Sequence, residues 1–269
     1  MSQIGKDFRL AQIINQESKK QVCIAMDHSP AIGPCEGMID PIASMTEICK
    51  GKPDTLFTHF GIIKKTMPVL AATRTPFLLS ISTATTMSPD PSRVILVDTV
   101  EHALEIGASG VSMRIFVGAQ FEHEMLQNLS KVALECERWG MPLMAMMYPH
   151  GVENILDPKC LRHAARIGAE LGADIVKTYY SGDPESFRTV TESCPVPIVM
   201  SGGPKADEPI DFLKLVRGAI DGGAIGVAVG RNVWQHPEPS KMIKAIGLVI
   251  HQGMSSQDAL EGAFGKQDS

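Results

Sequence analysis

The stretch GADIVKTYYSG (172–182) is an apolar, strand-like run that ends in Lys177, followed by two tyrosines and a glycine turn. A lysine at the end of a buried strand must be paired with an acid or be neutral, because burial penalises the ammonium ion. A neutral amine can attack a ketone carbonyl and form a Schiff base. A lysine paired with Asp27 or another carboxylate would instead be structural. The sequence leaves both interpretations open.

Further candidates stand where two other apolar runs end. Asp27 and His28 follow the run in IAMDHS, and Tyr148 ends the run in MAMMYPHG. In a closed pocket Asp27 could take and return protons, and the Tyr148 phenol could exchange one with a substrate hydroxyl. Each has a simpler interpretation: Asp27 could cap a turn or pair with an inward lysine, and Tyr148 could only pack its ring. His28 has the position of a hydrogen-bonding residue beside a turn.

Two glycine-containing segments, SGGPK (201–205) and AVGRN (228–232), predict an anion site. Their small residues leave backbone N–H groups accessible, and an arginine adds a positive charge. In barrels with eight strands, phosphate often binds at the loops after strands 7 and 8. The glycines could also serve turn geometry alone. The predicted phosphate-binding residues are Ser201, Gly202, Gly203, Gly230 and Arg231.

Eight short apolar runs must position these residues. They are continuous rather than alternating, as expected for parallel strands covered on both faces. The runs span 21–28, 55–61, 77–83, 110–116, 142–148, 174–180, 197–203 and 226–232. Helical patterns lie between them and end in GA or WG just before the next strand. In 122–140, for example, Leu129 and Cys136 share one helix face, and Gly140 stops the helix.

This alternation predicts an α/β fold, a closed (β/α)8 TIM barrel, and the 269 residues match its usual size. No GxGxxG follows the first strand, which disfavours an open dinucleotide-binding sheet. A helix at about 8–18 is expected to cover the barrel floor. We expect one domain, with an N-terminal helical segment (1–20), the barrel (21–250) and a C-terminal helix and tail (251–269). The candidates then gather at the C-terminal strand ends, where such barrels place their chemistry.

Composition excludes several classes of protein. With 44% hydrophobic and 20% charged residues the chain fits a globular enzyme, and its net charge of −5 argues against a nucleic-acid or membrane surface. Neither a signal peptide nor an 18-residue uncharged apolar segment is present, so we expect a cytoplasmic protein. Six cysteines without a CxxC pair predict free thiols. No convincing set of three metal ligands occurs at the strand ends, so neither metal nor cofactor is expected.

Five motifs in fixed order resemble the archaeal-type class I aldolase family: MDHSPAIGP, MMYPHG, GADIVKTYYSGD, SGGPK and GVAVGRNVWQH. The resemblance runs from about residue 20 to 250 and is strongest to the 2-amino-3,7-dideoxy-D-threo-hept-6-ulosonate synthase branch, a transaldolase-like relative of fructose-bisphosphate aldolase. It implies that Lys177 forms the Schiff base, that Tyr148 is the general acid, and that Asp27 assists proton transfer. It also implies phosphorylated ketose and aldehyde substrates and a homo-oligomer, often a decamer.

The chain departs from the family pattern at two places. His150 stands where relatives have an arginine after Tyr-Pro, and Ser82 to Thr85 replace a glycine pair at the end of strand 3. These changes affect the substrate pocket, for which we also predict His28, His59 and Thr85. Four other activities stay open: plain fructose-1,6-bisphosphate cleavage, thiolase-like acyl transfer on a phosphorylated diketone, non-covalent isomerisation, and sugar-phosphate sensing without catalysis.

Overall fold

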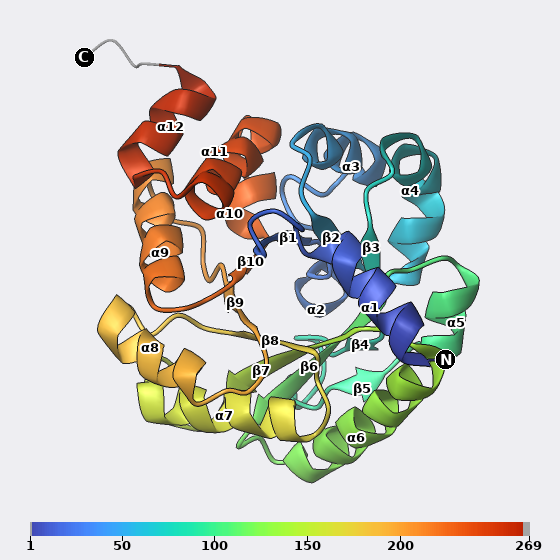
Figure 1. The fold of residues 1–269 in the computed structure, drawn as a ribbon. Coiled ribbons are helices and arrows are strands. Elements are labelled where there is room, and N and C mark those ends of the chain that lie inside the picture. Colours follow the sequence, from blue (N-terminus) through green and yellow to red (C-terminus); the bar gives the residue numbers. More distant parts are fainter. Residues whose placement is uncertain (1, 266–269) are drawn as a thin grey trace.

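Eight parallel strands close into a barrel in the computed structural model, which describes residues 2–265 (Figure 1). Their order around the barrel is β1-β10-β9-β8-β7-β6-β3-β2, and the predicted (β/α)8 fold is therefore confirmed. The barrel strands are β1 (Gln21–Ala25), β2 (Thr55–Thr58), β3 (Phe77–Ser80), β6 (Gly110–Val117), β7 (Leu143–Pro149), β8 (Ile175–Thr178), β9 (Ile198–Ser201) and β10 (Gly226–Val229). A separate antiparallel ribbon is formed by β4 (Ser82–Thr83) and β5 (Ile95–Leu96).

Helices follow the barrel strands and form the outer layer (Figure 1). Three of them begin at an Asp-Pro pair, in which the side chain of Asp40, Asp157 or Asp183 accepts a backbone N–H of the first turn. The helices are α2 (Ser29–Ile32), α3 (Pro41–Lys50), α4 (Phe60–Thr73), α5 (Val100–Glu105), α6 (Glu122–Trp139), α7 (Pro158–Glu170), α8 (Pro184–Glu192), α9 (Pro209–Asp221), α10 (Arg231–Trp234), α11 (Pro239–Gln252) and α12 (Ser256–Phe264).

The first helix, α1 (Ser2–Ile13), crosses one end of the barrel (Figure 1). Its last residue, Ile13, is fully buried in the interior cluster, and the Gln21 side-chain amide donates to the Ile13 carbonyl at 2.8 Å. A helix at 8–18 was the wrong range. The helix ends earlier because the Asn15 side chain accepts the N–H groups of the next turn and Lys19 has a positive φ of 57°.

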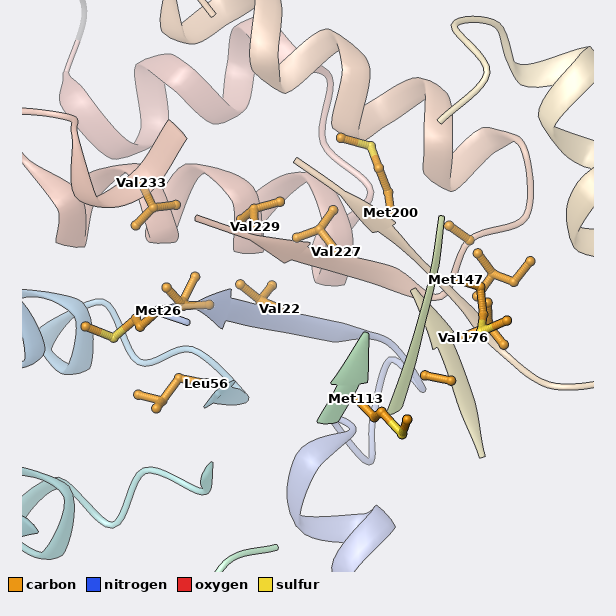
Figure 2. Packing of buried hydrophobic residues seen from close by; sticks show 14 of the residues in the cluster. Val22, Met26, Leu56, Met113, Met147, Val176, Met200, Val227, Val229 and Val233 are labelled. Atoms are coloured by element: carbon orange, nitrogen blue, oxygen red, sulfur yellow. The ribbon is translucent and has the colours of Figure 1, made fainter. Parts of the chain in front are cut away.

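Strand side chains alternate between two cores. Outward-facing residues pack beneath the helices, and Figure 2 shows Val22, Met147 and Val227 of this outer core. Inward-facing residues fill the barrel interior: Cys23, Ala25, Phe57, Leu78, Met144, Met146, Tyr148, Ile175, Val199 and Ala228. Because alternate residues of a strand share a face, Lys177 lies on the inward face with Ile175. The same alternation places the Arg114 side chain inward on β6, where Arg114 is the register partner of Met146 on β7.

Several predicted strands were too long at their C-terminal ends. The first was expected to reach residue 28 but stops at Ala25, so Asp27 and His28 lie in the loop that follows β1. Beyond Ala25, Met26 still donates its N–H to the Phe57 carbonyl at 2.9 Å, and Asp27 stays buried in the loop. All six cysteines are free thiols, as predicted. Within residues 2–265, none of the helices has both the length and the apolar character that crossing a membrane requires.

Candidate active site

A cavity of about 180 Å³ lies at the C-terminal ends of the barrel strands. The predicted catalytic residues and the predicted phosphate-binding residues all line it, and so does His28. The full lining consists of Ala25, Asp27, His28, Arg114, Phe116, Tyr148, Lys177, Tyr179, Ser201, Gly202, Gly203, Ala228, Gly230 and Arg231. Groups that are far apart in the sequence therefore share one cavity, as the strand-end argument predicts.

Lys177 enters the cavity from β8 and is only 4% exposed. Its Nζ lies 4.8 Å from the centre of the Phe57 ring, and it forms no ion pair among the described residues. Burial lowers the pKa of Lys177 to about 8, although attraction to Asp27 opposes that shift. Roughly a tenth of the amine is therefore neutral at pH 7, which is enough to make it a nucleophile.

Asp27 is 2% exposed and is paired with an arginine, since its Oδ2 accepts a hydrogen bond from Arg114 Nη2 at 2.9 Å. The alternative in which Asp27 pairs with Lys177 is wrong. Burial alone would raise the pKa of Asp27, but attraction to the Arg114 guanidinium outweighs it and brings the pKa to about 2. Asp27 is therefore an anion at neutral pH.

His28 lies beside this pair with a different charge state. Its Nδ1 is 3.5 Å from Asp27 Oδ1, and neither atom has a hydrogen-bond partner among the described residues. Burial lowers the pKa of His28 to about 4, in spite of the nearby carboxylate. The imidazole is therefore neutral at pH 7.

Tyr148 reaches the cavity from β7, the strand next to β8. Met146 of β7 is in register with Lys177 of β8. Tyr148 is the next inward-facing residue after Met146 along β7, so it lies closer to the cavity mouth than Lys177 does. The phenol is 3.3 Å from Ser201 Oγ, and its ring stacks on Tyr179 with centroids 4.6 Å apart. Burial raises the pKa of Tyr148 to about 12, so the group holds its proton at neutral pH and can donate it.

The segments that follow β9 and β10 carry the predicted phosphate-binding residues, together with Ser201 at the end of β9. Arg231 Nη2 donates to the Gly203 carbonyl at 2.9 Å, whereas its buried Nε has no partner within residues 2–265. At Gly230, a Cβ would fall 2.7 Å from His28 Cε1 and 2.9 Å from the Ala25 carbonyl oxygen. Only glycine fits at this position, and its backbone is consequently open toward the cavity.

Asn232 holds these two loops together. Its amide donates to the carbonyls of Gly202 (3.0 Å) and Pro204 (2.8 Å), and its oxygen accepts the Ala206 N–H at 2.8 Å. Because all of these bonds go to the backbone of the loop after β9, Asn232 fixes that loop relative to β10. The sequence interpretation noted Asn232 at a strand end and gave it no role.

Two of the predicted pocket residues do not line this cavity. His59 bonds the Ser80 carbonyl through Nδ1 at 3.0 Å, and its buried Nε2 lacks a partner within the described residues. Thr85 is exposed on a loop, where its hydroxyl accepts the Met87 N–H at 3.2 Å. The inward and outward alternation of side chains along a strand does not apply to Thr85, because the chain has already left β3.

The two departures from the family pattern also lie away from the centre of the cavity. Thr83 pairs with Ile95 in the β4–β5 ribbon, and Ser82 Oγ accepts the Arg114 N–H at 2.8 Å. His150 is exposed, and its ring lies 5.4 Å from that of Phe116. Neither replacement fills the cavity itself. The permanent positive charges within the lining are those of Arg114 and Arg231.

Five lining residues had no predicted role: Ala25, Ala228, Arg114, Phe116 and Tyr179. Period-two alternation could have found the last two, because Phe116 follows Arg114 by two positions and Tyr179 follows Lys177 by two. Among residues 2–265, no group of three or more His, Cys, Asp or Glu side chains has an arrangement that could hold a metal ion. The ionisable groups that line the cavity are an amine, two phenols, an imidazole, a carboxylate and two guanidinium groups.

Comparison with known proteins gives consistent matches. The sequence profile described as DeoC/LacD family aldolase matches residues 21–236. A 2-amino-3,7-dideoxy-D-threo-hept-6-ulosonate synthase of Archaeoglobus fulgidus is 35% identical over 96% of this chain and 95% of its own length. A 3-hydroxy-5-phosphonooxypentane-2,4-dione thiolase of an Enterobacter species is 35% identical over 96% and 85%. An archaeal fructose-1,6-bisphosphate aldolase, solved with its catalytic lysine bound to a carbinolamine intermediate, superposes with a TM-score of 0.85 at 31% identity, covering 91% of this chain and 99% of that one.

Proposed function

Because the chain belongs to the DeoC/LacD family of aldolases, we propose that it makes or breaks a carbon–carbon bond in a phosphorylated ketose through a Schiff base on Lys177. The observation that carries this proposal is the buried amine of Lys177, which faces a cavity without an ion-pair partner among the described residues. An amine in that state can add to a ketone, whereas a paired ammonium cannot.

The proposed reaction begins with attack of neutral Lys177 on the ketone, which gives a carbinolamine and then, by loss of water, an iminium ion. The iminium withdraws electrons from the adjacent carbon–carbon bond, which breaks as the C4 hydroxyl loses its proton and leaves an enamine. In the reverse direction the enamine attacks an aldehyde, and the new alkoxide needs a proton. Covalent attachment divides one high barrier into two lower ones.

We assign proton transfer at the substrate oxygen to Tyr148 rather than to Asp27. The alkoxide formed in the synthetic direction needs a donor that still holds its proton at neutral pH. With a pKa of about 2, Asp27 has no proton to give. The Tyr148 phenol holds its proton and lies on the strand beside Lys177, so it can donate to the developing alkoxide. Asp27 then contributes negative charge near the iminium ion.

Arg231 and the backbone of the two glycine loops are the proposed phosphate site. Changing Arg231 to Gln is expected to raise KM for a phosphorylated ketose roughly 10- to 100-fold, because one charge-assisted hydrogen bond is lost. The measurement compares the phosphorylated substrate with the same sugar lacking phosphate. Only the phosphorylated substrate should lose affinity, and equal losses for both would place the phosphate elsewhere.

A transaldolase-type synthase is the favoured activity within this class, because the ulosonate synthase match spans almost the whole of both chains. Thiolase-like acyl transfer is the second candidate, on the strength of an equally identical relative. The discriminating assay offers the enzyme an amino-acid-derived aldehyde, glyceraldehyde 3-phosphate or a coenzyme A thiol as acceptor. The homo-oligomer implied by the resemblance stays a prediction.

The test of the proposed function is borohydride reduction in the presence of candidate ketose phosphates, followed by peptide mass analysis. A stable adduct on the peptide with Lys177 is expected, and its mass identifies the trapped fragment. Trapping should accelerate as the pH rises through about 8, because the neutral fraction of the amine increases there. No adduct with any ketose phosphate, or an adduct on another lysine, would overturn the proposal.

A further inference from the structure

We propose that Arg114 is a positioning residue that takes the Asp27 carboxylate as its ion-pair partner and so keeps the amine of Lys177 available as a nucleophile. The contribution of Arg114 to catalysis rests on the proposed function. The charge state of Lys177, however, can be measured without turnover. The two proposals can therefore fail separately.

The geometry places three charged side chains from three elements around one cavity. Asp27 comes from the loop after β1, Arg114 from β6 and Lys177 from β8. The Asp27 carboxylate is almost fully buried and must have a counter-charge, because an unpaired buried anion is very costly. Arg114 meets that need with a hydrogen bond of 2.9 Å.

The two cations differ in whether they can lose their charge. An arginine side chain is not deprotonated in proteins, whereas a lysine titrates readily when it is buried. If Lys177 were the partner of Asp27, the pair would stabilise the ammonium ion and remove the nucleophile. With Arg114 as partner, Asp27 stays ionised and Lys177 is left without a partner among residues 2–265.

The other groups that act on Lys177 differ in their effect on the ammonium ion. The Phe57 ring, 4.8 Å from Nζ, favours the ammonium weakly through a cation–π contact, whereas the Cys23 thiol adds no charge because burial raises its pKa. Arg114 itself repels an ammonium ion at Lys177, and burial acts in the same direction. The attraction of Asp27 is the main opposing effect, and it is this effect that the arginine reduces.

Arg114 is also held in place by its backbone. Its N–H donates to the Ser82 hydroxyl at 2.8 Å, where the chain leaves β3. Its guanidinium then reaches Asp27 on the far side of β2 and β3 in the barrel order. Asp27 Oδ1 and His28 Nδ1 keep no hydrogen-bond partner within the described residues. Of the cationic or titrating groups that act on Asp27, loss of Arg114 would therefore leave Lys177 and the two histidines His28 and His59.

The test is the pH dependence of Lys177 acetylation by trace acetic anhydride, quantified by peptide mass spectrometry against a free amine. Arg114→Gln is expected to raise the midpoint by at least about one pH unit, which is roughly tenfold less neutral amine at pH 7. Asp27→Asn is expected to lower the midpoint, and the double variant should return it to the wild-type value or below. Arg114→Lys should rescue most of the shift.

Arg166→Gln is the matched control, because it removes an exposed pair with Glu170 (2.6 Å) on α7 and should leave the midpoint unchanged. An unchanged or lower midpoint in Arg114→Gln overturns the proposal. If that variant does not fold, as judged by circular dichroism, an unchanged midpoint in Asp27→Asn overturns it equally. A wild-type midpoint near pH 8 without any borohydride adduct would refute the Schiff-base function and leave this charge arrangement standing.

Discussion

Replacing Lys177 by methionine is expected to lower kcat/KM for the carbon–carbon bond reaction by at least ~10⁴-fold. Methionine occupies a similar volume against the Phe57 ring, and the loss is therefore that of the nucleophile rather than of packing. Steady-state kinetics with the ketose phosphate found by borohydride trapping measures the effect. The trapped adduct should disappear in the same variant.

Lys131→Met on the exposed face of α6 is the matched control, and it should behave like the wild-type enzyme. Full activity in Lys177→Met would contradict the Schiff-base proposal and support an isomerase that works through carboxylate and histidine. A wild-type chain that binds sugar phosphates but turns over none of them would instead indicate a sensor. The one substitution thus separates a covalent enzyme from two non-covalent alternatives.

The barrel could be predicted because its strands are buried on both faces. The apolar run 110–116 differs from β6 by one residue at its C-terminal end, and the run 142–148 differs from β7 by one residue at each end. The wrongly predicted boundaries lie where a side-chain hydrogen bond, rather than a change in the hydrophobic pattern, ends a helix or strand. Asn15 ends α1 by accepting two backbone N–H groups, and no apolar periodicity reports such a turn.

The members of the candidate site were also largely predictable, because parallel strands in a barrel open onto one face. Lys177, Tyr148 and Arg231 all lie at that face and line the same cavity. What the sequence could not supply is the pairing of charges across the barrel. Asp27 and Arg114 are 87 positions apart, one in the loop after β1 and the other on the non-adjacent strand β6, so only the closed barrel brings them within 2.9 Å. That pairing leaves Lys177, rather than Arg114, without an ion-pair partner among the described residues.

Changing Tyr148 to Phe is expected to lower kcat for the carbon–carbon bond step by roughly 10²–10⁴-fold, the usual contribution of a positioned acid or base. The ring should keep its stacking on Tyr179, because only the hydroxyl that contacts Ser201 is removed. Imine formation should persist, so borohydride must still trap substrate on Lys177. Single-turnover kinetics measures the bond-making step separately from trapping.

Tyr180→Phe is the control for this experiment, since its ring packs edge-on against Phe187, with centroids 5.1 Å apart, and does not line the cavity. If Tyr148→Phe kept kcat within about threefold of the wild type, another group would have to move the proton. Asp27 is a poor substitute, because its pairing with Arg114 keeps its pKa near 2. Loss of both trapping and turnover would mean that Tyr148 acts before the bond breaks, in the dehydration of the carbinolamine. The separation of trapping from turnover therefore locates the proton transfer within the reaction.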